Sequence, residues 1–106
     1  MKIHKLFFAI PFALASTIFT THALASEELA RKNGCFGCHA VNQKIVGPSL
    51  QEVALKYKSQ PDAAKKLAES LVKGSTGKWG TLPMPPQPQL SPGDALALAS
   101  WVLATR

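Results

Sequence analysis

The first part of the chain combines a positive start with a single long apolar run. Lys2 and Lys5 precede an almost wholly apolar stretch of 14 residues, 6–19, and 23–25 reads Ala-Leu-Ala, the small-x-small form of a signal-peptidase site. A membrane anchor would need about 20 apolar residues, and no stop-transfer pattern follows. The pattern predicts an exported protein with a signal peptide, 1–25, that is cleaved after Ala25.

The remaining chain repeats apolar residues every three or four positions and has no alternating strand-like run of useful length, which predicts an all-α fold. A short first helix is expected around 27–33, with Glu27 and Glu28 in its first turn and Gly34 as a left-handed cap. A second helix is expected to bury one face, formed by Leu50, Val53, Ala54 and Tyr57.

Two more helices follow from helix start and stop signals. Pro61 suits the first turn of the third, which is expected to end at Gly74. Ser91 and Pro92 open the fourth, and Asp94 is placed to complete a capping box. The expected buried positions are Ala64, Leu67, Ala68, Leu71 and Val72 in the third helix and Ala95, Leu98, Trp101 and Val102 in the fourth.

A long connection, 75–89, separates the third and fourth helices. It is rich in glycine and proline, poor in charge, and contains Trp79 and Met84. Long connections in small domains are usually functional. Its prolines predict a stiff loop that holds a side chain at a fixed place.

Composition adds two constraints. The expected mature chain, 26–106, has 81 residues and one domain, and a domain of this size usually needs a disulfide, a metal or a cofactor for stability. Its ten Lys plus Arg against six Asp plus Glu give a net charge near +4. Its lysines are dispersed without interleaved aromatics, so the charge indicates a solvated surface rather than a nucleic-acid site.

Two cysteines are the only candidates for such a stabilising link. A disulfide between Cys35 and Cys38 closes too short a loop to contribute much. A thioredoxin-like redox pair requires βαβ units, which the pattern lacks, and a zinc site requires further ligands, whereas His39 is the only histidine after the expected cleavage. The sequence Cys35-Phe36-Gly37-Cys38-His39 instead matches Cys-x-x-Cys-His, the attachment signature of a c-type haem, with histidine as the proximal iron ligand.

A low-spin haem needs a sixth ligand, and methionine, lysine or water are the candidates without a second histidine. Met84 is the only methionine left after cleavage and lies in Leu82-Pro83-Met84-Pro85-Pro86. A lone methionine is usually core filler, but prolines on both sides fix this backbone. We expect Met84 to be the second axial ligand, which raises the reduction potential.

These motifs, with Val46-Gly47-Pro48, 77–80 and 100–103, make the chain resemble the bacterial cytochrome c-551 family, also called cytochrome c8. The resemblance covers essentially the whole expected mature chain. It implies the class I cytochrome c fold, in which three to four helices surround one covalent haem c bound through Cys35 and Cys38.

The resemblance also implies roles by position. The Pro48 carbonyl is expected to bind the second ring nitrogen of His39, and the Trp79 indole to face a haem propionate. Two positions depart from the family pattern. Ser70 stands where many relatives have an arginine beside a propionate, and Gln87 replaces an asparagine near the methionine sulfur.

The function these features predict is a periplasmic one-electron carrier, not an enzyme. Its expected partners are redox proteins of the respiratory-complex, nitrite-reductase or terminal-oxidase type, with peripheral contact to membrane complexes, no nucleic acid, and a monomeric state. Two alternatives remain open: a haem subunit dedicated to one reductase or oxidase, and an open-site haem sensor or peroxidase.

Overall fold

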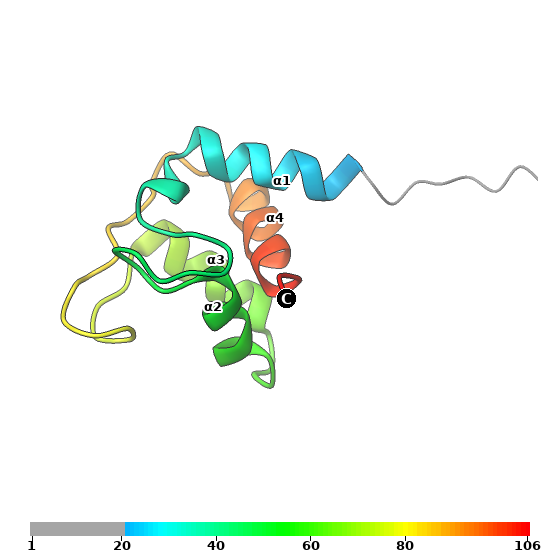
Figure 1. The fold of residues 1–106 in the computed structure, drawn as a ribbon. Helices are drawn as coiled ribbons and strands as arrows, with labels where there is room; N and C mark the ends of the chain where they lie inside the picture. The colour runs from blue at the N-terminus through cyan, green and yellow to red at the C-terminus, as the bar shows by residue number, and fades with distance from the viewer. Residues whose placement is uncertain (1–20) are drawn as a thin grey trace, which may run out of the picture.

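The computed structural model describes residues 21–106, so the predicted signal peptide lies outside the described residues except for 21–25. Within this range the chain forms helices and no named strand, which confirms the all-α prediction. The elements are α1 (Thr21–Lys32), the 3₁₀ turn η1 (Cys35–Gly37), α2 (Leu50–Tyr57), α3 (Ala63–Lys73) and α4 (Pro92–Leu103) (Figure 1). No helix of the described part is long and apolar enough to cross a membrane.

Helices α2 and α4 start at side-chain caps. The Ser49 hydroxyl accepts a hydrogen bond from the backbone N–H of Glu52, and the Glu52 carboxylate accepts one from the Ser49 N–H in return. This capping box satisfies two backbone donors that the first turn would otherwise leave free. In α4, Ser91 caps the N–H of Asp94 at 3.1 Å and Pro92 is the first helical residue, but the return bond from Asp94 is absent, so the predicted box is only half formed.

Two predicted helix starts are wrong. Helix α1 begins at Thr21 rather than at Glu27, because no glycine or proline interrupts the intervening residues, and Glu27 pairs with Arg31 at 2.9 Å instead of lying in the first turn. Helix α3 begins at Ala63, after a turn in which Asp62 has a left-handed φ of 57°, so Pro61 precedes the helix. The predicted end at Gly74 is confirmed.

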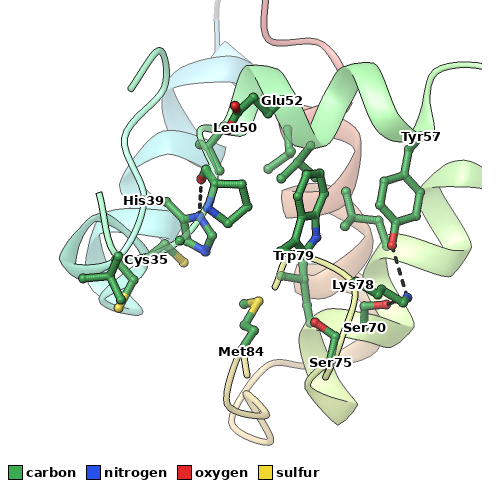
Figure 2. A pocket seen from close by; sticks show the side chains of 18 of the residues that line it. Cys35, His39, Leu50, Glu52, Tyr57, Ser70, Ser75, Lys78, Trp79 and Met84 are labelled. Carbon is green, nitrogen blue, oxygen red and sulfur yellow. Dashed lines mark hydrogen bonds between the residues drawn. The ribbon is translucent and has the colours of Figure 1, made fainter. Parts of the chain in front are cut away.

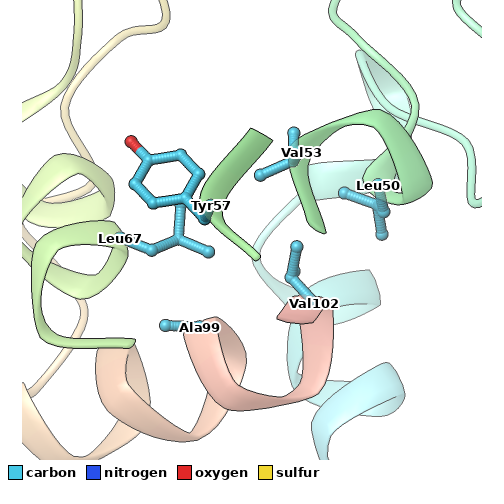
Figure 3. Packing of buried hydrophobic residues seen from close by; sticks show 6 residues of the cluster. All are labelled: Leu50, Val53, Tyr57, Leu67, Ala99 and Val102. Carbon is cyan, nitrogen blue, oxygen red and sulfur yellow. The ribbon is translucent and has the colours of Figure 1, made fainter. Parts of the chain in front are cut away.

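Helix α4 is the centre of the packing, because α1, α2 and α3 all lie against it. The larger buried cluster joins α2, α3 and α4 (Figure 3), and consists of Leu50, Val53, Tyr57, Leu67, Ala99 and Val102. A second cluster joins α1, the end of the long loop and α4, and consists of Ala30, Leu90, Ala95 and Leu98. The predicted buried face of α2 is confirmed in full.

The predicted faces of α3 and α4 need correction. In α3 only Leu67 is buried, and the other four predicted positions are half-buried. In α4 the sequence analysis missed Ala99, which is 0% exposed, whereas Trp101 is half-buried and meets Phe36 edge to face, with ring centroids 6.2 Å apart. The inner side of α3 therefore packs against the core but is not completely covered by it.

Candidate haem-binding site

A cavity of about 410 Å³ lies beside the core, between the segment after η1, the inner sides of α2 and α3, and the loop before α4. Its walls are mainly apolar and include Leu67 and Leu71 from α3, and the cavity explains why Leu71 is only half-buried by protein. Four potential haem-binding side chains open onto it, and Figure 2 shows three of them: Cys35, His39 and Met84, with Cys38 as the fourth.

His39 is held by the segment that follows it. Its Nδ1 lies 2.7 Å from the backbone oxygen of Pro48 (Figure 2). Because a carbonyl can only accept, the proton resides on Nδ1, and Nε2 keeps a free lone pair for a metal. The segment itself is fixed by backbone bonds, from the N–H of Gly47 to Cys38 at 2.7 Å and from that of Leu50 to Ala40 at 2.9 Å.

Gly47 packs directly against this imidazole. A Cβ at this position would lie 2.6 Å from Cε1 of His39, closer than any ordinary carbon contact. The glycine therefore allows the backbone to approach the ring. The sequence analysis quoted Gly47 as part of a motif but did not identify this contact.

Both cysteines border the cavity, Cys35 half-buried and Cys38 exposed, and they form no disulfide with each other. Burial raises the pKa of the Cys35 thiol, a backbone hydrogen bond lowers it, and the nearby Cys38 raises it further. Redox-active Cys-x-x-Cys pairs instead depend on a lowered thiol pKa. Within 21–106 no group of three or more His, Cys, Asp or Glu side chains is placed to hold a metal, which leaves the zinc reading without ligands there.

Met84 comes from the opposite wall, on the long loop. Two backbone hydrogen bonds pair it with Ser75, at 2.9 Å from the Met84 N–H and 3.1 Å from the Ser75 N–H. The next turn is tied to α3 by a bond from the Gln87 N–H to the Leu71 carbonyl. The position of Met84 is therefore fixed by its backbone pairing with Ser75 as well as by the neighbouring prolines. Nothing in the sequence pointed to Ser75.

Trp79 also lines the cavity, half-buried, and is held from outside by α2. The ammonium of Lys56 lies 4.2 Å from the centroid of the indole ring and donates to the backbone oxygen of Lys78 at 2.6 Å. A cation over an aromatic face is attracted by the ring electrons. Lys56 thus positions the Trp79 segment, a role the sequence analysis did not foresee.

The cavity fits a haem in shape and chemistry. Its rim exposes large apolar side chains, with Val46 53%, Leu55 68% and Leu82 61% exposed, which a flat apolar ring would cover. An imidazole nitrogen with a free lone pair and a thioether are suitable axial donors to iron. The thiols of Cys35 and Cys38 border the same space.

Comparison with known proteins gives a consistent result. The family model described as Cytochrome c matches residues 23–106. The chain is 44% identical over 95 residues to cytochrome c-552 of Nitrosomonas europaea, covering 90% of this chain and 92% of that protein. It is 40% identical over 103 residues to cytochrome c-551 of Pseudomonas aeruginosa, covering 91% and 98%. The crystal structure of wild-type Nitrosomonas europaea cytochrome c552 superposes with a TM-score of 0.74 at 48% identity, covering 76% of this chain and 99% of that one.

Proposed function

The chain belongs to the cytochrome c family, and from that membership we propose a haem site with two covalent attachment points and two axial ligands: Cys35, Cys38, His39 and Met84. The protein has the class I cytochrome c fold, holds haem c covalently and carries electrons. The observation that supports the ligand assignment best is the His39–Pro48 hydrogen bond, because it frees Nε2 toward the cavity that Met84 lines.

The iron of a bound haem supplies the one-electron chemistry by alternating between its ferric and ferrous states. The protein provides the surroundings. Pro48 fixes the orientation of the His39 ring, and the Ser75 pairing holds Met84 in place as a soft thioether donor, which favours the ferrous state. Trp79 is proposed to direct its indole N–H toward a propionate, since it lines the cavity.

If His39 and Met84 both bind the haem iron as proposed, no open coordination position would remain for a substrate, so we assign no bond-making activity to the protein. We propose that it is a monomeric carrier between redox proteins of the respiratory-complex, nitrite-reductase or terminal-oxidase type.

The axial assignment is tested by Met84→Ala in the mature holoprotein. The parent protein is expected to show a sulfur-to-iron charge-transfer band when oxidised and to bind no carbon monoxide at neutral pH. Met84→Ala is expected to lose the band and bind carbon monoxide. Leu82→Ala, a matched change in the same loop, is expected to retain the band. Ready carbon monoxide binding by the parent protein would contradict the carrier and favour an open-site haem protein.

Export is tested separately. We propose that the chain enters the periplasm and is cleaved after Ala25, which would shorten α1 to the part that begins at Ser26. The mass of haem-loaded protein from a periplasmic fraction is expected to match 26–106 plus one haem. Retention of 1–25 in that protein would refute the cleavage.

A further inference from the structure

One end of the haem cavity is polar, although most of its wall is apolar. Ser70, Tyr57 and Lys78 line this end, and Figure 2 shows them on the side away from Cys35, beyond Trp79. The Lys78 ammonium donates to the Ser70 hydroxyl at 3.0 Å and to the Tyr57 hydroxyl at 3.3 Å. Both partners are neutral, so the lysine charge is held in place but not balanced.

The Lys78 side chain and backbone are held by residues of two helices, α2 and α3. Tyr57 comes from α2, Ser70 from α3, and the backbone of Lys78 is itself held by Lys56. Ser70 and Tyr57 lie eight and 21 residues from Lys78 in the sequence, and both accept a hydrogen bond from its Nζ atom. A long, flexible side chain loses rotamer freedom in such an arrangement, so a compensating interaction is expected.

The surroundings make this end still more positive. A hollow of about 350 Å³ adjoins the cavity and shares Tyr57, Ser70 and Lys78 with it. Its charged lining residues are one glutamate and four lysines: Glu69, Lys56, Lys66, Lys73 and Lys78. Across 21–106 none of these five takes part in an ion pair within 4.0 Å. Lysines that line one hollow repel one another, and a bound anion would relieve this repulsion.

The chemistry of the cofactor supplies that anion. A haem carries its vinyl groups on one side of the ring and its two propionates on the opposite side. If Cys35 and Cys38 join the vinyl carbons, the carboxylates face the end of the cavity that lies away from the thiols. That end holds Lys78.

We propose that Lys78 pairs with a haem propionate, with the Ser70 and Tyr57 hydroxyls holding its ammonium in place. This inference rests on the proposed covalent attachment at Cys35 and Cys38. Lys78 then acts as a positioning and electrostatic residue rather than an axial ligand. Its positive charge disfavours the ferric haem, which carries one more positive charge than the ferrous form, so Lys78 raises the reduction potential.

The test is a redox titration of the mature holoprotein at fixed pH and salt. Lys78→Gln is expected to shift the reduction equilibrium toward the oxidised form by about three- to tenfold, the size expected for removing one partly screened charge near the iron. Lys78→Arg keeps the charge and is expected to stay within about twofold of the parent, by the same reasoning.

Lys73→Gln is the matched control, because Lys73 lines the adjacent hollow but not the haem cavity. It removes the same charge from the same end of the molecule. If Lys78→Gln shifts the equilibrium no more than Lys73→Gln does, the pairing is refuted and only a general charge effect remains.

A second variant, Ser70→Ala, tests the proposal if Lys78→Gln does not fold. Ser70→Ala leaves the lysine charge but removes one of the two hydroxyls that hold it, and a smaller shift in the same direction is expected. An unchanged equilibrium in both Ser70→Ala and Lys78→Gln refutes the proposal. Covalent haem and the sulfur-to-iron band are recorded in every sample. Their loss in the parent protein would defeat the proposed function, whereas an intact band with unshifted equilibria defeats the Lys78 assignment alone.

Discussion

Gly47 lies so close to the imidazole of His39 that it sets a residue-scale limit on the site. Gly47→Ala places a Cβ 2.6 Å from Cε1, and the ring must move away from the Pro48 oxygen or the backbone must shift. Overpacking of this kind costs about 1–3 kcal/mol. We expect a lower free energy of unfolding in denaturant and an altered absorption spectrum of the oxidised haem.

Gly93→Ala is the control for this substitution. Gly93 lies in the first turn of α4, has an ordinary φ, and an added Cβ would meet nothing within 4 Å. It is expected to be neutral or to stabilise by up to about 1 kcal/mol, because alanine favours helix. If Gly47→Ala and Gly93→Ala lower the free energy of unfolding equally, the close contact between Gly47 and His39 does not contribute to the effect.

The same scale shows what sequence can and cannot predict of the site. Cys35, Cys38 and His39 could be predicted as haem-binding residues because five consecutive residues carry the motif, and Met84 because prolines flank it. The hydrogen bonds of Lys78 to Ser70 and Tyr57 join residues eight and 21 positions apart. The contacts of Lys56 with Lys78 and Trp79 join residues 22 and 23 positions apart. No local spacing encodes such contacts, because they exist only once α2, α3 and the long loop are packed.

At the scale of elements, Gly74 joins the end of α3 to the Met84 loop. Its φ is +76°, and an added Cβ would lie 2.8 Å from both the Met84 oxygen and the Pro86 nitrogen. Both neighbours are backbone atoms that cannot rotate away. Gly74→Ala is expected to destabilise the protein by about 2–4 kcal/mol, through left-handed strain plus the clash. It is also expected to weaken the sulfur-to-iron band.

Gly77→Ala separates the two causes. Gly77 has a similar φ of +72°, but an added Cβ there meets nothing within 4 Å. Only the backbone strain of about 1–2 kcal/mol is expected, with the band intact. If unfolding measurements give the two variants the same loss of stability, the contact between α3 and the Met84 loop carries no energy of its own.

Buried faces were easier to predict than helix starts. In α2 the apolar spacing predicted the buried face in full, whereas the Ser49 cap that starts the helix was not predicted. In α3 the predicted start was wrong, because Pro61 was assigned to the first turn, whereas Asp62 adopts a left-handed φ and the helix begins only at Ala63. Leu71 of α3 follows the helical period and is half-buried, but it lines the cavity. Hydrophobic spacing reports that a face is covered, not whether protein or cofactor covers it.

At the scale of the whole molecule, the haem is expected to complete the core. Among the described residues no large side chain is fully buried, and the two clusters border a cavity of about 410 Å³. A double Cys35→Ala, Cys38→Ala variant cannot hold haem covalently, and small domains without such a link are marginal. We expect it to lose most of its helical circular dichroism signal and its cooperative thermal transition.

Cys38→Ala alone is the control, because one thioether remains possible. It is expected to retain helix whenever haem is bound. Cooperative unfolding of the haem-free double variant at the parent midpoint would show that the polypeptide core suffices without the cofactor.

The positive surface is expected to govern electron exchange. The expected mature chain, 26–106, has a net charge near +4, and four of its lysines line the hollow beside the haem cavity. Raising the ionic strength from about 0.01 M to about 0.1 M shortens the Debye length from about 30 Å to about 10 Å. Oxidation of the reduced protein by an anionic iron–cyanide complex is therefore expected to slow, and oxidation by a cationic metal–ammine complex to accelerate. Stopped-flow rates that change in the same direction for both reagents would contradict electrostatic steering.

The pairing of Ser75 with Met84 has a consequence for how such a protein can diverge. Two hydrogen bonds between Ser75 and Met84 close the loop at its base. We therefore expect that the sequence of the intervening residues, 76–83, can change while the Met84 sulfur stays in place. Lys78 and Trp79 both lie in that segment. Under the proposed assignments, the electrostatic role of Lys78 and iron ligation by Met84 could therefore change independently of each other. A chimera with 76–83 from a relative is expected to change potential while keeping the sulfur-to-iron band, and loss of the band would show that the two properties are inherited together.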